Sequence, residues 1–163
     1  MSISRAEREA LIDRYARGPA LLRATLAKIP KEAMQWRPRP DKWSAHEVIV
    51  HCADSETNAH GRIRYLVAEE APVIQGYDQA RWARVLDYHS LPWEPALATV
   101  EAVRANTTEL LRRLTDAQWA RIGTHTESGR YDALDWLHTY AEHLEIHSRQ
   151  LERNLAAWES GNT

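Results

Sequence analysis

The sequence of 163 residues has no phenylalanine, one cysteine and no long apolar run. The single cysteine, Cys52, cannot form an internal disulfide, and this favours a reducing, cytoplasmic location. No stretch approaches the roughly 18 apolar residues of a transmembrane helix, and the charged N-terminus lacks the apolar segment of a secretory signal. Basic tracts are also missing, because Lys and Arg number 21 against 23 Asp and Glu, for a net charge of -2. We therefore expect neither nucleic-acid binding nor membrane association.

The amino-acid composition is typical of a globular protein and is rich in histidine. Hydrophobic residues make up 44% and charged residues 27%, which excludes disorder as the default state. A chain of this length builds one ordinary hydrophobic core, so we expect residues 1–163 to form a single domain. The eight histidines are worth following, because neutral imidazole is the commonest metal ligand among side chains.

Four long amphipathic segments account for most of the chain and show almost no strand-type alternation. Glycine and proline separate them, and the predicted helices cover approximately residues 4–28, 44–70, 94–114 and 132–158. Ser4, Ser44 and Asp132 are suited to cap three of these helices, and Ser44 can form a capping box with Glu47. Four such helices predict an all-α four-helix bundle.

Three connections join these helices. Residues 29–43 contain the sequence RPRP, which precludes regular helix there, and residues 115–130 have turn chemistry. The connection at 73–95 is long, with room for one short helix near its middle. Within it, Tyr77 and Trp82 could line a substrate cleft or simply cover the open end of the bundle.

Three histidines are placed so that they could share one metal ion. His143 and His147 lie four residues apart, so on a helix they are separated by about 40° and one turn, and both rings can reach one ion. Both lie on a flank of the apolar face of the fourth helix, and His51 lies on a flank of the second. Bundles build metal sites from such facing positions. Spacing alone leaves a second interpretation open, since a histidine-rich helix yields such pairs by chance and a partly buried histidine often bonds only a carbonyl.

Two other metal motifs do not fit the sequence. His46-Glu47 followed by His51 is similar to the zinc-protease motif HExxH, but these histidines are five residues apart. On a helix they are about 140° apart and cannot share an ion. A di-iron carboxylate bundle uses Glu-x-x-His on two helices, and the sequence contains no Glu-x-x-His.

Two motifs contain the three histidines: H-x-A-D-S-x-x-N-A at 51–59 and Y-A-x-H-x-x-x-H at 140–147. In this order they resemble the DinB-like superfamily, and within it the YfiT-type metal-dependent hydrolases, over approximately residues 21–155. The resemblance implies a four-helix bundle in an up-down-down-up arrangement, with a long crossover between the second and third helices. It also implies a homodimer and one divalent metal ion, zinc or nickel, on His51, His143 and His147.

Three neutral nitrogen ligands leave a position open for water or substrate, as in catalytic zinc sites. Such an ion could lower the pKa of a water molecule or deprotonate a thiol, and the sequence does not separate these two possibilities. The resembling family includes thiol S-transferases, such as bacillithiol transferases, and a mycothiol-dependent isomerase. We therefore expect a metal-dependent hydrolase or a thiol S-transferase that acts on a small molecule, the latter with a low-molecular-weight thiol. The alternative is a non-enzymatic helical binding or dimerisation module with a structural metal.

Three further side chains are candidates for the surroundings of the metal. Asn58 and Arg62 follow His51 on the same flank of the second helix, where they would orient a substrate or ligand. For Arg62, a solvated polar seam between helices is the other interpretation. Glu56 falls inside the apolar stripe and needs a partner if it is buried. It would act as a general base or pair with an arginine of the first helix, and we favour the ion pair.

Overall fold

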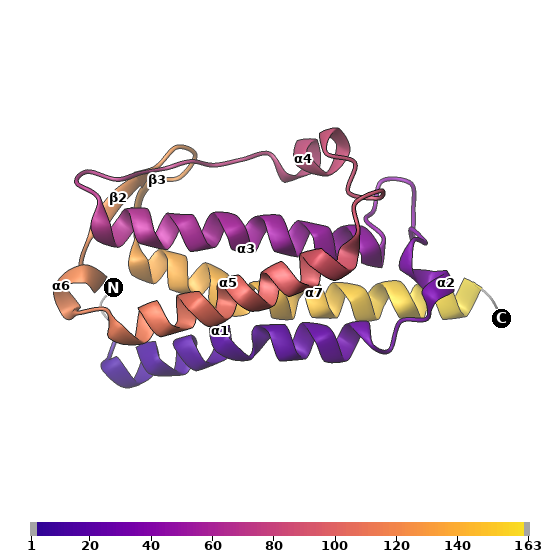
Figure 1. The fold of residues 1–163 in the computed structure, drawn as a ribbon, viewed down its shortest axis with the longest axis horizontal. Helices are drawn as coiled ribbons and strands as arrows, with labels where there is room; N and C mark the ends of the chain where they lie inside the picture. The colour runs from indigo at the N-terminus through magenta and orange to yellow at the C-terminus, as the bar shows by residue number, and fades with distance from the viewer. Residues whose placement is uncertain (1–2, 162–163) are drawn as a thin grey trace.

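Four long helices form the body of the structure, a computed structural model that describes residues 3–161 (Figure 1). They are α1 (Arg5–Leu26), α3 (Ala45–Ala68), α5 (Trp93–Arg113) and α7 (Ala133–Gly161). Three short helices lie in the connections: α2 (Lys31–Met34), α4 (Gln79–Val85) and α6 (Asp116–Trp119). The predicted all-α bundle is confirmed, although α2 and α6 are not predicted by the sequence pattern. Within residues 3–161, none of the helices is long and apolar enough to cross a membrane.

The four long helices run up, down, down and up (Figure 1). α1 and α7 point in the same direction and pack most extensively against each other, and α3 and α5 form the second parallel pair. Because α3 and α5 are parallel and consecutive, the chain must return along the bundle between them. Residues 69–92 make this return along α3 (Figure 1). The arrangement and the crossover that the resemblance implies are therefore confirmed.

Side-chain caps set the starts of three long helices. At α1 the Ser4 hydroxyl accepts from the Glu7 amide, and the Glu7 carboxylate accepts from the Ser4 amide. Ser44 and Glu47 repeat this capping box at α3, where it is buried. At α7 the Asp132 carboxylate accepts from two amides of the first turn. All three predicted caps are present, and the cap of α3 fixes the start of a helix that carries one candidate metal ligand.

A small three-stranded sheet, which the sequence pattern does not predict, lies beside the C-terminal end of α3 (Figure 1). β1 (Val73–Ile74) pairs in parallel with β2 (Ile122–His125), and β2 pairs antiparallel with β3 (Gly129–Asp132). The turn chemistry of residues 115–130 does give a turn, at 126–128, but the strands on either side of that turn are not predicted. Strands of two to four residues are too short to show an alternating pattern. The sheet depends on pairing between segments that are distant in the sequence.

A buried polar layer lies between the two larger clusters of the hydrophobic core. One cluster includes Trp136, and the other includes Cys52, which is fully buried. Along α3, Glu56 lies between Cys52 and Ala59, which belong to different clusters. Glu56 is 0% exposed and forms an ion pair with Arg104 of α5, which is 1% exposed. This layer lies directly beside the histidines.

Candidate metal centre

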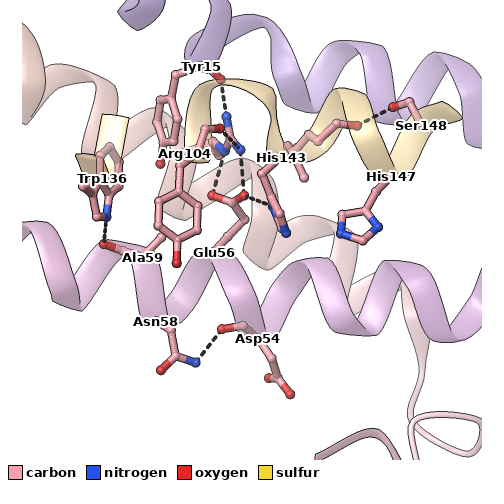
Figure 2. Close-up of polar contacts among 12 residues, drawn as sticks. Tyr15, Asp54, Glu56, Asn58, Ala59, Arg104, Trp136, His143, His147 and Ser148 are labelled. Atoms are coloured by element: carbon pink, nitrogen blue, oxygen red, sulfur yellow. Dashed lines mark hydrogen bonds and ion pairs between the residues drawn. The ribbon is translucent and has the colours of Figure 1, made fainter. Parts of the chain in front are cut away.

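The structure brings His51, His143 and His147 together between two helices. One ring nitrogen from each lies within 4.8 Å of the others. The centre of the His51 ring is 5.7 Å from that of His143 and 4.8 Å from that of His147. Figure 2 shows His143 and His147 projecting from α7 toward α3, the helix that carries His51. Residues that are far apart in the sequence therefore converge on one point.

Glu56 fixes the orientation of His143. The Nδ1 atom of His143 lies 2.8 Å from a carboxylate oxygen of Glu56 (Figure 2). Burial would raise the pKa of Glu56, but the charge of Arg104 and the hydrogen bond from His143 outweigh it and hold that pKa below its ordinary value. Because a carboxylate only accepts hydrogen bonds, Nδ1 of His143 carries a hydrogen, and in the neutral ring the lone pair is then on Nε2. Metal-binding histidines commonly make this second contact.

Arg104 in turn connects all four long helices. Its Nε and Nη2 donate to the two carboxylate oxygens of Glu56 on α3, at 2.7 and 2.6 Å. Its Nη1 donates to the Tyr15 carbonyl of α1 at 2.6 Å (Figure 2). Its Nη2 also donates to the Tyr140 carbonyl of α7 at 2.8 Å. Gly18 of α1 makes room for this group, since a Cβ there would lie 3.1 Å from Nη1. The polar layer therefore sets the spacing of the helices that carry the histidines.

The other two histidines have different surroundings. Nδ1 of His147 donates to the Gln150 side-chain oxygen at 2.9 Å, which leaves Nε2 free. Nδ1 of His51 is buried and has no hydrogen-bond partner, and the Trp43 ring packs 4.8 Å from the His51 ring. Burial, with smaller effects of the neighbouring histidines, lowers the pKa of His51 to about 2. Burial, followed by the effect of His143, lowers the pKa of His147 to about 4. Both rings are therefore neutral near pH 7 and offer lone pairs.

This donor set fits a divalent transition metal. Imidazole nitrogen suits zinc and nickel, and three such ligands are the number found in catalytic zinc sites that keep one position open. A buried polar atom without a partner costs free energy. An ion held through Nδ1 of His51 would remove that cost, so the unpartnered nitrogen supports the fit.

The sequence model of the DinB superfamily matches residues 14–151 of this chain, and the protein therefore belongs to that superfamily. Among curated relatives, a "putative metal-dependent hydrolase" of Oceanobacillus iheyensis is 36% identical over 129 residues, which are 79% of this chain and 74% of that protein. The "putative metal-dependent hydrolase YfiT" of Bacillus subtilis is 27% identical over 158 residues, which are 94% of this chain and 89% of that protein. The family resemblance inferred from the sequence is confirmed.

Solved structures agree with this assignment. The structure of Bacillus subtilis YfiT, described as "a probable metal-dependent hydrolase with an unusual four-helix bundle topology", has a TM-score of 0.85 at 26% identity and covers 95% of this chain and 91% of that one. A mycothiol-dependent maleylpyruvate isomerase has a TM-score of 0.62 at 12% identity, and covers 92% of this chain and 60% of that one. At that identity the isomerase supports the fold alone.

Of the other predicted site residues, Arg62 lies near the histidines and Asn58 does not. The Asn58 amide donates to the backbone carbonyl one turn earlier at 2.8 Å, on the side of α3 that faces away from α7 (Figure 2). Arg62 donates to the Tyr140 hydroxyl at 2.9 Å and to the Gln75 carbonyl at 2.6 Å. The Tyr140 ring lies 5.8 Å from the His143 ring, so one side chain separates Arg62 from the candidate ligands. The substrate-orienting roles of Asn58 and Arg62 stay predictions.

The expected partner of Glu56 needs a correction. Glu56 does pair with an arginine, but this is Arg104 of α5 and not an arginine of α1. At this level α1 offers the Tyr15 carbonyl, while the neighbouring Arg14 pairs with Glu145 at the edge of α7. The sequence does contain a signal for the correct partner, because Arg104 follows the helical spacing of buried residues in α5, namely Leu97, Val100, Thr107 and Leu111.

Proposed function

We propose that this chain binds one divalent metal ion, zinc or nickel, on His51, His143 and His147 and acts on a small molecule as a metal-dependent hydrolase. The observation that carries this proposal is the convergence of three imidazole nitrogens within 4.8 Å, from two helices. The names of the relatives point to the same class. When bound, such an ion supplies Lewis acidity and makes a water molecule or a thiol beside it easier to deprotonate.

The surrounding residues prepare the three ligands. Glu56 and Gln150 each accept the Nδ1 hydrogen of one histidine of α7, so both rings present Nε2 to the same side. Trp43 covers the His51 ring and keeps water from that side of the site. Ligands held in this way lose little rotational freedom when the ion binds, which favours tight binding.

Thiol S-transfer is the second candidate. Histidine binds a metal ion in its neutral form, so a divalent ion on these three side chains would keep its full charge and would favour an anionic thiolate. In that reaction a low-molecular-weight thiol is the cosubstrate, and the small molecule is the electrophile that receives it.

One experiment separates these activities. The zinc-loaded, nickel-loaded and metal-free proteins are assayed for hydrolysis of an activated ester, and for transfer of glutathione, cysteine or bacillithiol to 1-chloro-2,4-dinitrobenzene. We expect one activity to require metal, to be lost in His143→Ala and to persist in His138→Ala, which changes an exposed histidine of the same helix. If chelation lowers only the melting temperature and both activities are absent or independent of metal, the protein is a non-enzymatic module with a structural metal.

A further inference from the structure

Within residues 3–161, three arginines bind both carboxylate oxygens of a glutamate through the same edge of the guanidinium group, formed by Nε and Nη2. The Nε and Nη2 distances to carboxylate oxygens are 2.7 and 2.5 Å for Arg14, 2.8 and 2.6 Å for Arg37, and 2.7 and 2.6 Å for Arg104. At Arg62 this edge is only half used, because Nη2 donates to the Gln75 carbonyl and Nε is buried without a partner. Within residues 3–161, no carboxylate lies within 4.0 Å of the Arg62 guanidinium.

The side-chain groups around Arg62 are uncharged hydroxyl groups. Nη1 of Arg62 donates to the Tyr140 hydroxyl, which also interacts with the Ser55 hydroxyl. The guanidinium carbon lies 5.7 Å from the centre of the Tyr77 ring, and the Tyr77 hydroxyl is buried beside the Ser55 hydroxyl. Burial raises the pKa of Tyr77 to about 12, so this hydroxyl keeps its hydrogen. The cluster therefore holds a positive charge and an unpartnered Nε donor but, among the described residues, no carboxylate, and an anion would satisfy it.

This cluster lies between open space and the candidate metal centre. A cavity of about 360 Å³ is lined by residues of α3 and of the segment that follows it, including Arg62 and Gln75. Gly61 also lines the cavity, and a Cβ at that position would meet no atom within 4 Å. On the other side, Tyr140 lies one turn before His143 on α7, with ring centres 5.8 Å apart. A small ligand in the cavity would thus contact Arg62, and the Tyr140 side chain would separate it from the histidines.

We propose that Arg62 binds a carboxylate group of the small-molecule substrate, with the Tyr140 and Tyr77 hydroxyls as further donors. The carboxylate takes the place of the Gln75 carbonyl on Nη2 and supplies the missing acceptor for Nε, as glutamates do for the three other arginines. This proposal rests on the proposed function and narrows its substrate class to small molecules that carry a carboxylate apart from the reacting group.

The test is a nuclear magnetic resonance titration of the full chain. The zinc-loaded protein is titrated with succinate or with neutral succinamide while the arginine Nε–H signals are followed. We expect succinate to shift the Arg62 signal saturably and succinamide to leave it unchanged. Arg62→Lys keeps the positive charge but loses the paired edge, so its affinity for succinate should fall by about tenfold or more, measured through the remaining shifted signals.

Arg64→Lys is the matched control, because Arg64 lies on the same helix but donates to Asn106 and to the His60 carbonyl, on the side of α5. It should bind succinate like the unmodified protein. If Arg62→Lys binds succinate as well as Arg64→Lys, or if succinamide causes the same shifts, the carboxylate subsite is excluded. Metal content is measured in the same samples: zinc bound without a succinate effect at Arg62 leaves the metal proposal standing, whereas a succinate effect in a protein that holds no zinc supports the subsite and removes the metal proposal.

Discussion

Replacement of Glu56 by Gln tests whether the buried polar layer holds the bundle together. The Glu56 carboxylate accepts two hydrogen bonds from Arg104, at 2.7 and 2.6 Å, and one from His143 at 2.8 Å. Both side chains of the ion pair are almost fully buried, at 0% and 1% exposure. The neutral amide of Glu56→Gln would leave the Arg104 charge buried and uncompensated, at a cost of about 3–5 kcal/mol. For a domain of this size, that loss lowers the melting temperature by roughly 6–20 °C.

The matched control is Glu145→Gln. Glu145 makes a similar paired contact with Arg14, at 2.7 and 2.5 Å, but the two side chains are 25% and 35% exposed. Solvent screening limits the loss there to about 1 kcal/mol or less. Urea unfolding of the metal-free proteins, followed by circular dichroism, measures both free energies. If Glu56→Gln costs no more than Glu145→Gln, the reasoning about the buried layer is refuted.

Three further predictions concern the helices, pH and metal. Gly18→Ala should destabilise the protein by about 1–3 kcal/mol, because the added Cβ would meet buried side chains at 3.0–3.2 Å. Gly61→Ala, whose Cβ would meet no atom within 4 Å, should stabilise the protein by about 0.5–1 kcal/mol. Urea midpoints that move in the same direction for both variants would contradict this. Burial opposes ionisation of Glu47, but hydrogen bonds from Arg37 and from the α3 cap hold the pKa of Glu47 below 4.5. The ionised carboxylate therefore stabilises the folded state above pH 4.5, and this stabilisation is lost as the pH falls through the lowered pKa. The difference in urea midpoint between the unmodified protein and Glu47→Gln should therefore shrink below pH 4.5, and a constant difference between pH 3 and 7 would exclude this effect. Zinc at about 100 times its dissociation constant should stabilise the unmodified protein by about 2.7 kcal/mol and leave the stability of His147→Ala unchanged. Equal shifts of the melting temperature in the two proteins would argue against His147 as a ligand.

Local patterns in the sequence account for the helices and for half of the candidate site. The spacing of His143 and His147 on one helix follows from helical periodicity, and the start of α3 follows from its serine cap. The approach of His51 to that pair depends on how α3 packs against α7: periodicity places His51 only on a flank of its own helix, and the resemblance to a family joined it to the pair. The choice of Arg104 as the partner of Glu56 likewise depends on which helices are neighbours in space. The small sheet was missed for the same reason, since its pairing joins short segments across a long sequence separation.

The central claim is that three imidazole nitrogens from two helices hold one ion. Its most direct test is the zinc content and affinity of the unmodified protein and of single alanine variants of His51, His143 and His147, with His138→Ala as the control, after equilibrium dialysis. We predict one zinc ion per chain in the unmodified protein and in the control, and a loss of affinity of at least about tenfold in each of the three variants. Stoichiometric zinc that survives all three substitutions with unchanged affinity would contradict the account.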